Sequence, residues 1–155
     1  MPSTLVDLAA VAKRQEARAE KRGEGPAHDE YWCMFDIDDH VKIPEALDKA
    51  SANGIGVAVT NPCVELWFLL HFRPQTAYLE REEAQKLSKE VTRCDKRLTE
   101  GATKQLVDKF LDAKSRAIEL DKKHDGDGSP PRSNPSSNVY ELIDRIRAGP
   151  SRSGK

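Results

Sequence analysis

Three aspartates, Asp36, Asp38 and Asp39, end the segment YWCMFDIDDH at residues 31–40, directly after an apolar run. Neighbouring carboxylates repel one another, and each favours protonation if it lacks a partner. Side chains alternate along an extended backbone, so Asp36 and Asp38 point the same way and can share one ligand. A hard cation such as Mg²⁺ (or Mn²⁺) would keep both ionised. The spacing therefore predicts a divalent-metal site. The alternative is that the acidic residues only solvate the end of a strand.

Glu65 is a further carboxylate in an unusual place, the first turn of the apolar segment NPCVELWFLLHF at residues 61–72. A negative charge near a helix N-terminus is favourable by about 0.3–1 kcal/mol, which is too little to offset full burial. We therefore expect Glu65 to contact water, a donor or a cation. Asn61, one turn earlier, is expected on the same side of the helix. His71 could be a ligand, a base or a core histidine, and the sequence alone favours the core histidine.

A strand, a helix and a second strand are expected to position the aspartates. Residues 31–36 and 55–60 are apolar on both faces, which is typical of parallel strands covered on both sides. Between them, Pro44 to about Asn53 is expected to be a helix. This order fits a right-handed βαβ unit. Asp36 would then lie at the carboxyl end of the first strand, the edge where open α/β sheets bind ligands.

The rest of the chain is expected to be helical. Thr4 to about Arg22 predicts a helix, and residues 61–72 predict a buried helix with Asn61 as its cap and Pro62 at its first position. Two apolar stripes predict an antiparallel helical hairpin. The stripes are Ala84, Leu87, Val91, Cys94 and Leu98, and then Leu106, Phe110, Ala113, Ala117 and Leu120. Residues 125–137 are expected to be a loop, and residues 138–148 a last helix.

Composition narrows the class of protein. The 155 residues carry 25 basic and 26 acidic side chains, so the net charge of -1 gives no global reason to expect nucleic acid or a membrane as partner. The cysteines Cys33, Cys63 and Cys94 are widely spaced, which argues against a disulfide framework or a zinc site. No segment has the form of a signal peptide or a membrane span. We expect a cytoplasmic protein without a membrane partner.

Several segments together resemble the RloB-like family, proteins of prokaryotic restriction and phage-defence loci related to Toprim-fold nucleases. They are WCMFDIDDH, TNPCVELWFLLHF, CDK at residues 94–96 and NPSSNVYELI at residues 134–143. The block Asn-Pro-Cys-x-Glu-Leu-Trp is the most distinctive, and the likeness covers most of residues 28–147. The resemblance implies an α/β fold: a small, mostly parallel, truncated Toprim-like sheet flanked by helices, with the long helical hairpin. It also implies one domain over residues 1–148, with a helix and linker over 1–27 and a disordered tail over 149–155.

The resemblance also implies an activity and a site. Asp36 and Asp38 fall on the paired aspartates that hold a divalent cation in Toprim-like sites, with Asp39 as an auxiliary ligand. The expected activity is Mg²⁺-dependent hydrolysis of phosphodiester bonds in DNA or RNA, and the catalytic candidates are Asp36, Asp38, Glu65 and His71. Further family motif positions are Asn61, Pro62, Asn134 and Asn138.

One departure from the family pattern affects the expected activity. Family members begin with a strand and a turn of the form EGxxTE, and nothing of that form precedes the aspartates here. Either the true start lies upstream or the chain is a truncated relative. The sheet would then expose an apolar edge through which the chain associates with itself or a partner. The alternatives to an enzyme are a non-catalytic module that binds nucleic acid or metal, and a remnant that needs a partner for stability.

Overall fold

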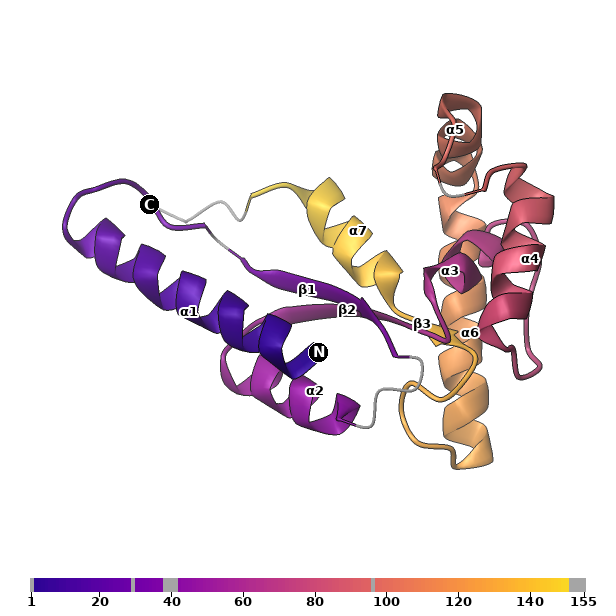
Figure 1. The fold of residues 1–155 in the computed structure, drawn as a ribbon, viewed down its shortest axis with the longest axis horizontal. Coiled ribbons are helices and arrows are strands. Elements are labelled where there is room, and N and C mark those ends of the chain that lie inside the picture. The colour runs from indigo at the N-terminus through magenta and orange to yellow at the C-terminus, as the bar shows by residue number, and fades with distance from the viewer. Residues whose placement is uncertain (1, 29, 38–41, 96, 151–155) are drawn as a thin grey trace. The chain divides into compact units, whose positions relative to one another are not determined.

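The computed structural model describes residues 2–28, 30–37, 42–95 and 97–150, so Asp38 and Asp39 lie outside the described residues. Helices predominate over a small three-stranded sheet, which confirms the predicted α/β class (Figure 1). The helices are α1 (Pro2–Lys21), α2 (Ile43–Ala52), α3 (Val64–Leu70), α4 (Arg81–Thr92), α5 (Glu100–Asp108), α6 (Phe110–Asp127) and α7 (Val139–Ala148). The strands are β1 (Trp32–Asp36), β2 (Gly56–Asn61) and β3 (Ser136–Ser137).

The chain forms two compact units. Unit 1 contains Met1–Met34, Asp39–Ala58 and Glu141–Lys155, and unit 2 contains Phe35–Asp38 and Val59–Tyr140. The single domain expected over residues 1–148 stays a prediction. Within the described part of the chain, no helix combines the length and the apolar character that a membrane crossing requires.

The sheet has the strand order β1-β2-β3. In unit 1 the N–H of Gly56 donates to the carbonyl of Tyr31 at 2.9 Å, and in unit 2 the N–H of Ile37 donates to the carbonyl of Thr60 at 2.9 Å. β1 and β2 therefore run parallel, as the predicted βαβ unit requires. β3 pairs antiparallel with β2, with Asn61 opposite Ser136. The sequence analysis assigned β3 to a loop, and that assignment is wrong for these two residues.

In unit 1, α1 lies along α2 (Figure 1). Both helices bury small or branched side chains, Val6 and Ala10 on α1 and Ala46 and Ala50 on α2. The Nζ of Lys13 donates to the carbonyls of Asn53 at 2.8 Å and Gly54 at 3.0 Å. A cation at these carbonyls is favourable because the C-terminus of a helix carries partial negative charge. The helices predicted from Thr4 and from Pro44 are both confirmed.

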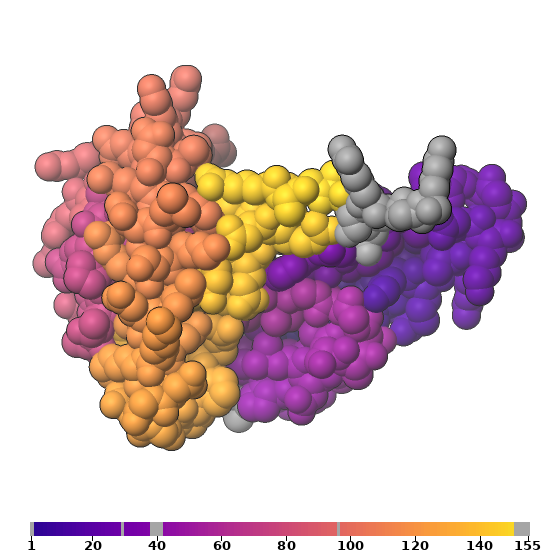
Figure 2. Space-filling view, turned by 180° about the vertical axis from the view of Figure 1, so that it is seen from behind, coloured from indigo at the N-terminus to yellow at the C-terminus, as the bar shows by residue number. Residues whose placement is uncertain are grey.

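In unit 2, α3 is the central helix, and α4 and α6 both pack against it (Figure 1). Leu66, Leu69 and Leu70 of α3 are fully buried, which confirms the prediction of a buried helix in this segment. The ring of Trp67 meets Phe110 of α6 edge to face, with 6.3 Å between the centroids. Seen from behind, α6, in orange, forms much of the surface of this unit (Figure 2).

The first helix of the predicted hairpin is shorter than expected. α4 ends at Thr92, because Arg93 takes a left-handed conformation with φ 58°. Cys94 and Leu98 therefore lie beyond the helix, and the prediction that one stripe runs through them is wrong. The buried face of α4 consists of Ala84, Ser88 and Thr92, one position away from the predicted Leu87 and Val91.

The second predicted helix is two helices, since α5 ends at Asp108 and α6 begins at Phe110. The predicted buried stripe is confirmed all the same, and its members are Leu106, Phe110, Ala113, Ala117 and Leu120. α6 continues to Asp127 and ends at Gly128, which is left-handed with φ 69°. The predicted start of the loop at residue 125 is therefore wrong, because glycine here terminates the helix three residues later.

Candidate functional site

The candidate site contains two carboxylates of unit 2, Asp36 and Glu65, and the charges of both act on the buried thiol of Cys63. Asp36 is the last residue of β1, and Glu65 lies in the first turn of α3, just after the end of β2. Burial raises the pKa of Cys63 to about 12, and the hydrogen bond to Glu65, the charge of Glu65 and the charge of Asp36 add to this rise. The thiol stays protonated at neutral pH and is no nucleophile.

Arg81 lies beside Asp36. The Nη2 of Arg81 is 3.8 Å from Oδ2 of Asp36, and the two side chains are 41% and 29% exposed. Arg81 is the first residue of α4. The guanidinium therefore offsets part of the negative charge for which the sequence analysis expected a metal ion. Arg81 was not among the predicted site residues, because nothing in its sequence context distinguishes it from the other surface cations.

The residues fit a hard cation in their chemistry. The carboxylate oxygens of Asp36 and Glu65 are ligands that Mg²⁺ and Mn²⁺ accept. The other two predicted ligands, Asp38 and Asp39, lie outside the described residues. Among the residues that the structure does describe, no group of three or more His, Cys, Asp or Glu side chains could hold a metal ion. The metal site therefore stays a prediction.

Asn61 and Pro62 have roles other than helix capping. α3 begins at Val64 with Cys63 as its N-cap, and Asn61 ends β2 before a cis peptide bond to Pro62. The prediction that Asn61 caps the helix and Pro62 opens it is wrong. The Nδ2 of Asn61 instead donates to the carbonyl of Arg132 at 2.8 Å. This bond ties the end of β2 to the loop that precedes β3.

The other two motif asparagines bind backbone. Asn134 accepts from the N–H of Leu79 at 2.9 Å and donates from Nδ2 to the carbonyl of Leu79 at 2.8 Å. Leu79 is buried two residues before Arg81, so Asn134 helps to place the start of α4. Asn138 accepts from the N–H of Val59 at 2.7 Å. Both side chains are therefore structural in this geometry.

His71 lies at the opposite end of α3 from Glu65. Six residues of helix separate them, which is about 9 Å along the axis. The ring is 3% exposed, and Nδ1 donates to the carbonyl of Trp67 at 2.8 Å. Burial lowers the pKa of His71, and the positive charge of Arg116 lowers it further. The structure thus gives His71 the partners of a core histidine, at the end of α3 away from Glu65. A catalytic role stays a prediction.

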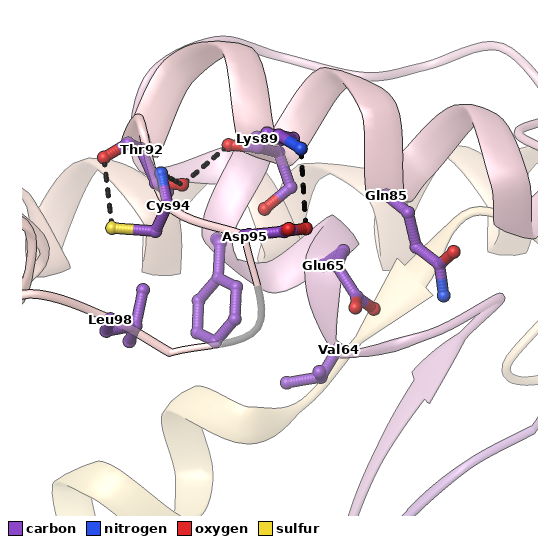
Figure 3. A pocket seen from close by; sticks show the side chains of 10 residues that line it. Val64, Glu65, Gln85, Lys89, Thr92, Cys94, Asp95 and Leu98 are labelled. Carbon is purple, nitrogen blue, oxygen red and sulfur yellow. Dashed lines mark hydrogen bonds and ion pairs between the residues drawn. The ribbon is translucent and has the colours of Figure 1, made fainter.

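Glu65 also borders a pocket of about 510 Å³, lined by the start of α3, by α4 and by the segment after α4 (Figure 3). Figure 3 shows Glu65 and Gln85 at one end of the pocket and Thr92, Cys94 and Leu98 at the other. Lys89 and Asp95 form an ion pair on the wall, with 3.4 Å between Nζ and Oδ1. The sequence analysis did not find this pocket, because its walls come from segments that are apart in the chain.

A comparison with known families gives a match over nearly the whole chain. The model of a family described as "RloB-like protein" matches residues 1–146 of the chain. No curated protein and no solved structure matches the chain. The matched range contains each sequence-predicted site residue, and these are Asp36, Asp38, Asp39, Asn61, Pro62, Glu65, His71, Asn134 and Asn138.

Proposed function

The chain belongs to the RloB-like family, and we propose that it hydrolyses phosphodiester bonds of nucleic acid with Mg²⁺ or Mn²⁺, in prokaryotic defence against phage. The observation that carries the proposal is the placement of two carboxylates: Asp36 ends β1, and Glu65 lies in the first turn of α3, the helix that follows the neighbouring strand β2. The defence role follows from the resemblance of the motifs to proteins of restriction loci. Asp36 and Asp38, with Asp39 as an auxiliary ligand, would hold the cation.

The chemistry requires a polarised phosphate and an activated water, and a divalent cation bound at these carboxylates supplies both. Glu65 is half-buried and adjoins the pocket, where its carboxylate can accept a proton from water. Such a general base typically contributes about 10²–10⁴-fold to the rate.

Arg81 is the group we assign to the substrate phosphate. A planar guanidinium binds phosphate oxygens through two parallel hydrogen bonds. In the absence of a cation, Arg81 pairs with Asp36 instead. Binding of a cation to Asp36 would replace this ion pair and leave the guanidinium beside the site where the phosphate binds.

The same ion pair favours a second candidate function. A carboxylate that a guanidinium already compensates needs no cation. The chain would then be a non-catalytic module that binds nucleic acid, or metal, without turnover.

Cleavage assays on the full chain test the proposal. Single- and double-stranded DNA and RNA are incubated with Mg²⁺, with Mn²⁺ or with EDTA. We expect cation-dependent cleavage that falls at least about 10²-fold in Asp36→Asn and in Asp38→Asn. Asp108→Asn, at the exposed end of α5, is the matched control and should cleave like the wild type.

Two outcomes decide against the proposal. Cleavage that is unchanged in both site variants rules out the aspartates as the site. Binding of nucleic acid or metal without any turnover, in a protein whose circular dichroism is that of a folded chain, supports the non-catalytic module.

A further inference from the structure

The pocket beside Glu65 has the size of a small-ligand site. Its volume of about 510 Å³ falls within the roughly 300–1,000 Å³ that is usual for such sites. All its described lining residues belong to unit 2, and Glu65 is shared with the candidate active site. A substrate whose phosphate lies at Asp36 would therefore reach this pocket with its adjoining group.

The charge of the wall disfavours a phosphate. The charged side chains among the described lining residues are the carboxylates of Glu65 and Asp95 and the ammonium of Lys89. Lys89 already pairs with Asp95 at 3.4 Å, as the dashed line in Figure 3 shows. The Coulomb energy of an anion in this pocket is therefore unfavourable. The ligand that fits is a neutral group.

The remaining lining residues favour a flat ring. Val64, Phe68 and Leu98 provide apolar surface, and Phe68 is half-buried, so part of its aromatic face is accessible. Aromatic faces bind nucleobases by stacking, whatever the base. At the far end, the hydroxyl of Thr92 already accepts a hydrogen bond from the backbone N–H of Cys94, at 3.2 Å. The polar recognition therefore belongs to the end with Glu65 and Gln85.

We propose that this pocket holds one unstacked nucleobase that carries an amino group, from the single strand whose phosphodiester lies at Asp36. This inference rests on the proposed function. The oxygens of Glu65 and Gln85 accept hydrogen bonds, and the amino groups of adenine, cytosine and guanine donate them. Uracil has no amino group, and its one N–H donor lies between two carbonyl oxygens that a carboxylate repels. The substrate class is thus single-stranded nucleic acid with an amino-bearing base next to the scissile bond.

Fluorescence anisotropy in EDTA tests the pocket separately from cleavage. The full chain is titrated into labelled ten-nucleotide RNAs of adenine, cytosine or uracil. We expect at least about tenfold tighter binding of the adenine and cytosine strands than of the uracil strand. Phe68→Leu should weaken the binding of all three strands, by up to about tenfold for the loss of stacking. Gln85→Ala, on the exposed side of α4, should reduce the preference for amino-bearing bases.

The controls keep the pocket and the catalytic site apart. Gln105→Ala, an exposed glutamine on α5, should bind like the wild type. Asp36→Asn should keep the base preference even where it abolishes cleavage. Equal binding of adenine and uracil strands overturns the pocket assignment while leaving the cleavage result intact. A base preference that survives both Phe68→Leu and Gln85→Ala places base recognition elsewhere and overturns it as well.

Discussion

Asn138 forms a closed pair of hydrogen bonds with the backbone of Val59, one through its side chain and one through its own N–H. The N–H of Val59 donates to Oδ1 of Asn138 at 2.7 Å, and the N–H of Asn138 donates to the carbonyl of Val59 at 3.1 Å. Both residues are buried, and Asn138 directly follows β3. The amide oxygen thus serves the N–H of a residue in β2 where the two residues of β3 provide no partner. Hydrogen bonds to the backbone thus explain this family motif position without a catalytic role.

Asn138→Ala should destabilise the protein. The buried N–H of Val59 would lose its acceptor, and leaving such a donor unsatisfied costs about 1–3 kcal/mol. Urea unfolding followed by circular dichroism measures the free energy of unfolding. Gln105→Ala, an exposed glutamine on α5, should stay within about 0.5 kcal/mol of the wild type. An unchanged midpoint in Asn138→Ala would mean that water satisfies the Val59 N–H.

Gly56→Ala should also lower stability, because the ring of Trp32 lies across Gly56. A Cβ at residue 56 would be 2.4 Å from Cδ2 and 2.5 Å from Cε2 of Trp32. Forcing such a contact costs about 1–3 kcal/mol of stability. Thermal unfolding measures this loss. Gly101→Ala is the matched control: nothing lies within 4 Å of a Cβ there, and the helix α5 favours alanine. Equal losses in the two variants would contradict the steric explanation.

Arg81→Gln should bind Mn²⁺ more tightly and nucleic acid more weakly. The guanidinium of Arg81 competes with a cation for Asp36 in the free protein, and in the proposed mechanism it then binds phosphate. Isothermal titration with Mn²⁺ measures the first effect, and anisotropy with a labelled single strand the second. Adding Asp36→Asn to Arg81→Gln should abolish the gain in Mn²⁺ affinity. Weaker binding of Mn²⁺ in Arg81→Gln would show that Mn²⁺ and the guanidinium of Arg81 do not compete for Asp36.

His71 should make stability fall in mildly acidic solution. Its pKa in the folded protein is lowered from 6.5, so between the two values the unfolded state binds more protons than the folded state. The stabilisation is therefore present above pH 6.5 and is lost as the pH falls towards the lowered value, by at most about 1.4 kcal/mol per pH unit. Urea unfolding at pH 7.5, 6.5 and 5.5 should show a smaller loss in His71→Gln than in the wild type. Equal losses would contradict the buried, neutral histidine.

Tyr31→Phe should raise the pKa of Glu16. The hydroxyl of Tyr31 donates to Oε2 of Glu16, and this bond is the largest cause that lowers the pKa of Glu16 to about 2, ahead of the hydrogen bonds from His28. Without it, the pKa should move towards the ordinary 4.5. A carbon-detected NMR titration of the carboxyl group measures the change. Tyr78→Phe, at an exposed tyrosine, should leave the pKa of Glu16 where it is.

Sequence patterns predicted those elements whose cause is local. β1, β2 and α2 follow from apolar runs and from a proline at a helix start. The break at Lys109 between α5 and α6 has no such local signal, since lysine is a good helix former. Ser88 and Thr92 are polar, yet both are buried on α4, because tertiary packing determines which face of this helix is buried. β3 is two serines long, and only its pairing with Thr60 and Asn61 makes it a strand.

The candidate site was predictable in part for the same reason. Asp36 follows directly on an apolar run, and Glu65 lies in the first turn of an apolar helix, so their positions at a strand end and a helix start could be predicted from the sequence. Arg81 approaches Asp36 only through the fold, and Asn134 reaches Leu79 across 55 residues of chain. Single positions of this kind carry no periodic signal. Their roles depend on the folded arrangement of the chain.

Asp36 belongs to a short segment of unit 2, Phe35–Asp38, that precedes the remainder of the unit, Val59–Tyr140. A recombinant fragment confined to residues 59–140 would carry Glu65, Arg81 and the nucleobase pocket, but it would lack Asp36. Any contiguous fragment that includes both carboxylates must also include Asp39–Ala58 from the other unit. A contiguous fragment therefore cannot contain the proposed site without this segment of unit 1, and loss of activity in the fragment 59–140 would be no evidence against the proposed site.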